Sequence, residues 1–261
     1  DAVGWQQQLA GAPQPSVLLL GEQHDAPEHQ QWERATVTQL AQQNRLAAVV
    51  LEMAHAGHHT TALPLTATEA EVQSALDWTS AGWPWERYAS IVMAAVQASV
   101  PVHGGNLPRA AMRSVMQQTP WDSHLDAAAW QRQLDAIHTG HCGLLPESQL
   151  VPMARIQLAK DASMAQAARA LVQPGQTVVL IAGRGHVLRG VGIPTWLPPQ
   201  VSTGVAVAQS EGGEPTLASD RDWLVQTAAP PAQDHCAELR NRWQSGAPGA
   251  ATPSPKAVQN P

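Results

Sequence analysis

Four short apolar segments constrain the fold of this chain most strongly. They are SVLLLG (16–21), LAAVVLEM (46–53), SVPVHGGN (99–106) and QTVVLIAG (176–183). They lack a strict alternation of apolar and polar residues, which is typical of strands covered on both faces. Helical patterns lie between them, at about 28–43, 85–98 and 147–172. This alternation predicts an α/β fold with a central, mainly parallel sheet flanked by helices.

The rest of the chain predicts one domain with a small insertion. A further strand is expected at 201–209 and a short helix at 236–243, which completes a single domain over residues 1–245. Residues of about 54–98 are expected to include a small helical insertion or lid. Its HAGHH stretch (55–59) is interpreted as a flexible, histidine-rich loop. The tail 246–261 is rich in Pro, Ala and Ser with little to bury, so we expect it to be disordered.

The net charge of the chain limits its expected binding partners, and its two cysteines relate to the cellular compartment. The formal net charge is −6 and lysine is scarce, so nucleic acid is not an expected partner. No apolar run approaches the ~20 residues of a membrane span. The chain begins with Asp1, and we expect that an N-terminal segment was removed, with a cleaved secretory signal as one candidate. Cys142 and Cys236 form a disulfide if the protein is exported and stay reduced in the cytosol, and both alternatives remain open.

Charged and polar side chains follow the predicted strands at their carboxyl ends. They are Glu22 and His24 after the first, Glu52 in the second, Asn106 and Arg109 after the third, and His186 after the fourth. In open α/β sheets ligands bind beyond the carboxyl ends of the strands. We therefore expect these residues, which are far apart in sequence, to converge on one polar cleft. Glu28 and His29 are expected to begin the helix that follows and to be solvated.

The chemistry of these residues allows more than one interpretation. A carboxylate such as Glu52 at the end of a buried strand needs a cation, a metal or a raised pKa, and Arg109 is one candidate partner. Glu22, His24, Glu52 and His186 would also suit a divalent metal with mixed nitrogen and oxygen ligands. Such a site would activate water, with Asn106 and Arg109 in support, and would make the protein a hydrolase of small esters or amides.

An ordered set of motifs resembles a known family. LLLGEQHDAPEHQ, VVLEM, WPWERYASIV, GGNLPR, HCGLLPES with DASMA, and VVLIAGRGHV occur in the order found in the ChaN-like haem-binding uptake proteins. That family belongs to the Tiki superfamily, which is related to the erythromycin-esterase-like enzymes. The resemblance implies an α/β fold and an exported protein, either periplasmic or an outer-membrane lipoprotein, in haem or iron uptake. It also implies that Glu22, His24, Glu52 and His186 form the metal-dependent site of the wider superfamily.

The resemblance further implies a haem cofactor. Family haem binding resembles tyrosinate ligation between two subunits, and Tyr88 is the only tyrosine of this chain. Trp83 and Trp85 would cover the porphyrin, Arg87 would pair with a propionate, and His141 is the second candidate ligand. A homodimer, an outer-membrane haem receptor or transport components, and a membrane contact only through a lipid anchor are the expected partners. The sequence leaves open whether the protein is a haem-binding accessory protein or a hydrolase.

Overall fold

The computed structural model describes residues 2–230 and 234–244 of the chain. Within these residues one sheet contains β1 (Val17–Glu22), β2 (Leu46–His55), β3 (Val102–Asn106), β4 (Thr177–Gly183), β5 (Thr203–Ser210) and β6 (Trp223–Thr227). The strand order is β3-β2-β4-β1-β5-β6, and every neighbouring pair is parallel. The predicted α/β class and parallel sheet are confirmed.

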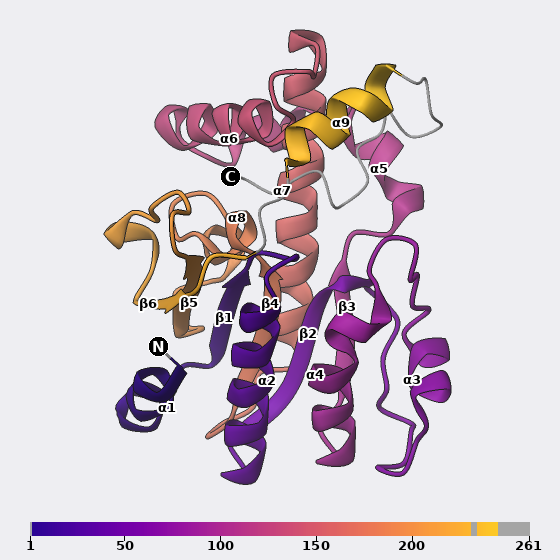
Figure 1. Ribbon diagram of the computed structural model, residues 1–261, viewed down its shortest axis with the longest axis vertical. Helices are drawn as coiled ribbons and strands as arrows, with labels where there is room; N and C mark the ends of the chain where they lie inside the picture. The colour runs from indigo at the N-terminus through magenta and orange to yellow at the C-terminus, as the bar shows by residue number, and fades with distance from the viewer. Residues whose placement is uncertain (1, 231–233, 245–261) are drawn as a thin grey trace.

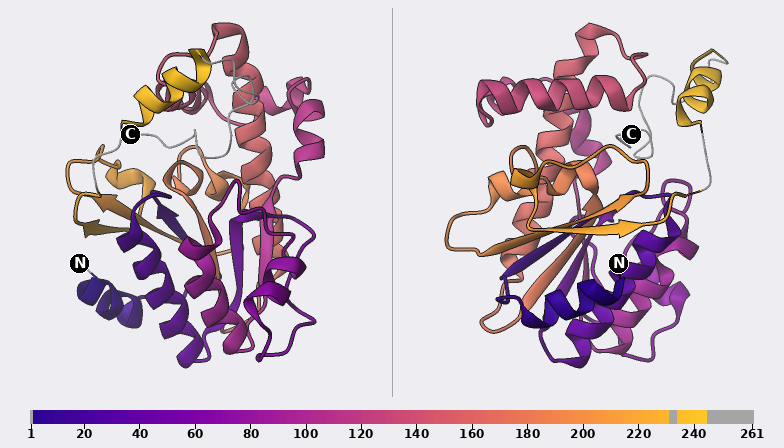
Figure 2. Two further views of the ribbon diagram at one scale, coloured as in Figure 1. Left: turned by 45° about the vertical axis from the view of Figure 1, so that its right-hand side comes forward. Right: turned by 60° about the vertical axis from the view of Figure 1, so that its left-hand side comes forward.

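Helices cover both faces of this sheet. The α-helices are α1 (Ala2–Gly11), α2 (Pro27–Gln42), α3 (Glu69–Ala75), α4 (Trp85–Gln97), α5 (Arg109–Val115), α6 (Ala127–Gly140), α7 (Glu147–Ala170), α8 (Arg184–Val187) and α9 (His235–Gln244). Short 3₁₀ helices are η1 (Thr119–Ser123), η2 (Ile193–Trp196) and η3 (Ala218–Asp220). Helices α2 and α4 lie on one face and α7 on the other, while α6 and α9 lie beyond the carboxyl ends of the strands (Figures 1 and 2).

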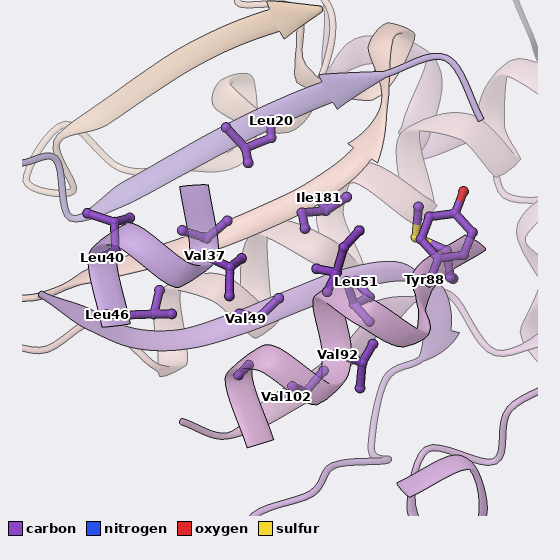
Figure 3. Packing of buried hydrophobic residues seen from close by; sticks show 14 of the residues in the cluster. Leu20, Val37, Leu40, Leu46, Val49, Leu51, Tyr88, Val92, Val102 and Ile181 are labelled. Atoms are coloured by element: carbon purple, nitrogen blue, oxygen red, sulfur yellow. The ribbon is translucent and has the colours of Figure 1, made fainter. Parts of the chain in front are cut away.

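Burial on both faces explains why the strands do not alternate. Every residue of β1 and β4 is buried. Leu18 and Leu20 of β1 face the cluster formed with α2 and α4, whereas Val17 and Leu19 face the cluster formed with α7. Figure 3 shows part of the first cluster, in which side chains of strands and helices interdigitate. Each central strand therefore buries apolar side chains on both sides, which favours continuous runs of Val, Leu and Ile.

Several peripheral elements were not predicted from the sequence. They are α1, α5, α6 and β6. α1, α5 and β6 are short, and α6 buries only Gln133, Ile137 and Gly140, so none of them carries a long buried apolar pattern. Tertiary contacts hold them instead, as for α1, where Trp5 packs edge-on against Trp32 and Trp223.

The HAGHH stretch is not a flexible loop, so that prediction is wrong. His55 ends β2, and His59 forms an antiparallel bridge with His103 of β3. The backbone amide of Gly104 donates to the His58 carbonyl at 2.9 Å, and that of Thr60 donates to the Val102 carbonyl at 2.9 Å. These bonds hold the segment against the free side of β3.

The two cysteines are joined, and the expected helix near residue 236 is present. Cys142 and Cys236 form a disulfide with a Cα–Cα distance of 5.6 Å, which ties α9 to the end of α6. The predicted disordered tail lies outside the described residues. Among the helices described, none is long and apolar enough to cross a membrane.

Candidate functional site: a buried carboxylate–imidazole network

The strand order brings the predicted polar residues together. Because β4 lies between β1 and β2, the carboxyl ends of these three strands are adjacent. Glu22 ends β1, Glu52 lies near the end of β2, and His186 follows β4 in the short helix α8. All three are buried, with relative exposures of 1%, 2% and 4%. The fold thus brings these three residues together at one end of the sheet, where they are buried rather than facing an open cleft.

Glu22 is surrounded by hydrogen-bond donors. The Tyr88 hydroxyl donates to its Oε1 at 2.7 Å, and His24 Nδ1 lies 2.7 Å from the same oxygen. The side-chain amide of Gln30 donates to Oε2. Burial alone would lower the pKa of His24, but its hydrogen bond to Glu22 and the charges of Glu22 and Glu52 raise it. These contacts favour the protonated form of His24 beside Glu22.

Glu52 is held by the backbone and by both imidazoles. The Gly183 amide donates to its Oε2 at 2.7 Å, and His24 Nε2 lies 3.8 Å from that oxygen. His186 Nε2 lies 3.3 Å from Oε1. Burial would raise the pKa of Glu52, but the charge and hydrogen bond of His186, together with the charges of His24 and Lys160, hold it far below its usual value. The cation that Glu52 required is thus an imidazolium rather than Arg109.

Asp161 of α7 completes the network on the other side of His186. His186 Nδ1 forms a short ion pair with Asp161 Oδ1, and the Gln157 amide lies 3.0 Å from the same nitrogen. Burial would lower the pKa of His186, but the charges of Glu52 and Asp161 raise it to about 10. Burial raises the pKa of Asp161 to about 6, against the opposing charge of His186. A continuous chain of contacts therefore runs from Tyr88 through Glu22, His24, Glu52 and His186 to Asp161.

The raised pKa of His186 predicts how stability depends on pH. A group whose pKa is higher in the folded state stabilises the protein fully below its unfolded value, near 6.5, and loses that effect as the pH rises through about 10. We expect the free energy of unfolding to fall from about pH 7 to about pH 9.5. Urea unfolding across this range should show a shallower slope for His186→Gln. Equal slopes in the two proteins would contradict the protonated state of His186.

Glu33 is a further buried carboxyl group beside Glu22. It is fully buried in α2, and neither carboxyl oxygen has a hydrogen-bond partner among the described residues. Burial and the neighbouring charge of Glu22 raise the pKa of Glu33 well above its usual value. These effects favour the uncharged form of Glu33, because an unpaired charge at this depth would be costly.

The aromatic residues expected to hold haem lie under the surface. Tyr88 is fully buried, with its ring beside the apolar side chains labelled in Figure 3 and its hydroxyl used by Glu22. The Trp83 ring meets the His24 ring edge-on, with centroids 4.7 Å apart. Trp85 donates from Nε1 to Glu69 at 2.6 Å. Arg87 is exposed, but it donates to the His24 carbonyl at 2.9 Å.

The remaining predicted residues differ in burial and in hydrogen bonding. Asn106 is buried and donates to the Glu52 carbonyl at 2.8 Å. Arg109 is exposed at the start of α5, and no ion pair joins it to Glu52 in the described structure. His141, at the end of α6, is buried; its Nδ1 bonds the Ile137 carbonyl at 2.7 Å. Its Nε2 has no hydrogen-bond partner within the described residues.

His29 corrects one expectation about the start of α2. We expected it to be solvated together with Glu28. Glu28 is exposed, but His29 is fully buried, and its Nδ1 accepts from the Gln23 amide at 2.9 Å. Its Nε2 lies 3.0 Å from the Thr227 hydroxyl of β6. His29 thus joins the first turn of α2 to the edge of the sheet.

A pocket opens beside one end of the network. It has a volume of about 370 Å³ and is lined by residues of α6, α8 and the segment 214–220. Gly183, His186 and Gln157 form part of its wall, whereas Tyr88 and Trp83 are not among its lining residues. A ligand in this pocket would meet the network at His186.

The geometry does not support a divalent metal in the network. In the part of the chain that the structure describes, no group of three or more His, Cys, Asp or Glu side chains is arranged to hold a metal ion. The imidazole nitrogens of His24 and His186 face carboxylate oxygens instead, so their lone pairs are not directed at a common point. Without such a metal-binding group among the described residues, the hydrolase interpretation is not favoured.

Two pairs of network residues were missed in the sequence. Gln30 and Glu33 lie three residues apart on α2, and Gln157 and Asp161 lie four apart on α7. Residues at these spacings share one face of a helix. Both helices bury these polar positions among apolar ones. Polar residues recurring at this spacing on otherwise buried helix faces were the signal that could have identified them.

This protein is of the α/β class. Its parallel sheet holds a buried carboxylate–imidazole network at the ends of the strands. Residues 8–197 match the family described as haem-binding uptake, Tiki superfamily, ChaN. The chain therefore belongs to this haem-binding uptake family, and the resemblance seen in the motifs is confirmed.

A solved structure agrees with this assignment. The structure described as cofacial haem binding to ChaN of Campylobacter jejuni is similar to this chain, with a TM-score of 0.69 and 25% sequence identity. The match covers 85% of this chain and 90% of that chain. None of the curated proteins is a significant match.

Proposed function

We propose that this protein binds haem as an accessory protein of bacterial haem or iron uptake. The observation that carries the proposal is the family match, which spans residues 8–197 and so includes the whole network. The similarity to the Campylobacter jejuni structure, which is described as cofacial haem binding, supports it.

The described conformation does not fit axial ligation by Tyr88. A tyrosine ligand needs its oxygen at the iron, yet Tyr88 is fully buried and its hydroxyl donates to Glu22 at 2.7 Å. Ligation would require this hydrogen bond to break and the segment carrying Trp83 to move. The other candidate, His141, has an Nε2 with no hydrogen-bond partner among the described residues but is also buried, with 2% relative exposure.

A hemin titration tests both the function and the part played by Tyr88. We expect stoichiometric hemin to shift the Soret band of the wild-type protein, and no shift would contradict haem binding. Tyr88→Phe removes only the hydroxyl, so we expect it to keep the Soret shift. It should lower the free energy of unfolding by about 1.5–3 kcal/mol, because Glu22 loses one of its donors. Loss of the shift in a folded Tyr88→Phe protein would instead identify Tyr88 as a ligand. His141→Gln tests the second candidate in the same assay.

We extend the proposal to the environment and assembly of the protein. Export to an oxidising compartment is supported by the Cys142–Cys236 disulfide, since such bonds persist mainly outside the cytosol. The pocket beside His186 is proposed as the polar ligand site at the strand ends. A homodimer, a lipid anchor and a receptor or transport partner in the outer membrane follow from the family resemblance. Size-exclusion chromatography with and without hemin tests the dimer.

A further inference from the structure

A pair of histidines faces each other at the edge of the sheet, away from the buried network. β3 is the edge strand, and the segment after β2 folds back along its free side. The bonds from Gly104 to His58 and from Thr60 to Val102 flank His59 and His103. In this antiparallel pattern the flanked residues form a non-hydrogen-bonded pair, the arrangement in which opposing side chains are closest.

Gly104 permits this arrangement. A Cβ atom at position 104 would lie 2.1 Å from the His55 carbonyl oxygen, which is too close for any other residue to occupy the position without a backbone shift. This close contact is with the end of β2, from which the returning segment leaves, and the hydrogen bonds of His58 and Thr60 hold that segment against β3. The positions of His59 and His103 are therefore set by the main chain rather than by a mobile loop.

The two imidazoles are placed to share a ligand. Their ring centroids lie 5.1 Å apart with a tilt of 34°. His59 is exposed and His103 is partly buried. The Thr61 hydroxyl lies 3.5 Å from His103 Nε2, at the outer limit of a hydrogen bond, and no hydrogen bond is made by the His59 ring in the described structure. The ring nitrogens are thus available to a third atom between them.

Of the histidines in the returning segment, only His59 faces His103. His58 takes no part, since neighbouring side chains of an extended segment point to opposite sides. It faces Asp77 instead, with Nε2 4.0 Å from Oδ2.

We propose that His59 and His103 form a two-histidine site for a divalent transition-metal ion, Cu²⁺ or Zn²⁺. Imidazole suits both ions, and Cu²⁺ is expected to bind more tightly. With only two protein ligands, the other coordination positions are filled by water or small anions, and the affinity is lower than in three- or four-ligand sites. The site is separate from the carboxylate–imidazole network and does not depend on the proposed haem function.

Calorimetric titration of the untagged protein with CuCl₂ and with ZnCl₂ tests the site. We expect one ion per chain, with affinity reduced by roughly tenfold or more, or about 1.4 kcal/mol, in His59→Ala and in His103→Ala. The His59 variant alters an exposed side chain and should fold normally, as circular dichroism can check. His138→Ala is the matched control, because His138 is exposed and lies outside the pair.

Three results would overturn the two-histidine site. They are unchanged affinity in either His59→Ala or His103→Ala, an equal loss of affinity in His138→Ala, and no binding of either metal by the wild-type protein. The hemin titration should give the same result for His59→Ala and the wild type, so failure of the metal site and failure of the haem proposal are distinguishable.

Discussion

Replacing Glu52 with glutamine is expected to lower the free energy of unfolding by about 3–5 kcal/mol, the cost of removing one partner from a buried ion pair. Glu52 accepts the Gly183 amide and faces both His24 and His186. Glutamine has nearly the same shape, but it carries no charge and turns one acceptor into a donor. The amide group would then point at a backbone or imidazole N–H, and each imidazole would lose one of the two carboxylate charges that raise its pKa.

Urea unfolding monitored by tryptophan fluorescence measures this effect. Glu86→Gln is the matched control, since Glu86 is exposed on α4, and we expect it to change stability by no more than about 0.5 kcal/mol. A loss below about 1 kcal/mol in Glu52→Gln would mean that the pair contributes little net charge stabilisation. The pH dependence described above would then also be absent, so the two measurements check each other.

Removing the disulfide is expected to lower the free energy of unfolding by about 2–4 kcal/mol. Cys142 and Cys236 are 94 residues apart, so the bond restricts a large loop in the unfolded chain. Without it, α9 would be held by weaker contacts. Trp243 packs against the cluster that contains Ile137, and His235 Nε2 lies 2.8 Å from Asp25 Oδ2. This one contact is partly open to water on the His235 side, so it contributes little.

Urea unfolding of the Cys142→Ser/Cys236→Ser double variant measures this loss. Dithiothreitol should destabilise the wild-type protein by a similar amount and leave the variant unchanged. If dithiothreitol has no effect on the wild-type protein, the disulfide contributes nothing to stability. This experiment also bears on compartment, because a bond that matters for stability would be retained only where thiols are oxidised.

The sequence predicted the sheet well because the central strands carry a strong local signal. Continuous apolar runs such as Val17–Leu20 are buried on both faces, and no other common element explains them. It predicted α6 and β6 poorly, because these peripheral elements bury few residues and owe their place to neighbours. It also misjudged His59, whose conformation depends on a backbone pairing with His103, 44 positions further along the chain.

In the candidate site, too, the residues at strand ends were predicted from the sequence and the residues on α2 and α7 were not. Glu22, His24, Glu52 and His186 were found because each follows or ends a predicted strand, and parallel strands place such residues at one edge. Asp161, Gln157 and Glu33 come from helices that pack over that edge. The spacing of buried polar residues on these helices could mark them as candidates, but only the packing of α7 and α2 brings them beside the network.

By itself, the sequence determined the α/β class, the carboxyl-end position of the network and the family. These features follow from hydrophobic patterns and short motifs that act within a few residues. Only the tertiary structure decided which charges pair. In it, Glu52 faces His24 and His186 rather than Arg109. The Tyr88 hydroxyl donates to Glu22, and His59 lies opposite His103. Pairing depends on distances of a few ångströms between segments remote in sequence, and the packing of the whole sheet and its helices sets those distances.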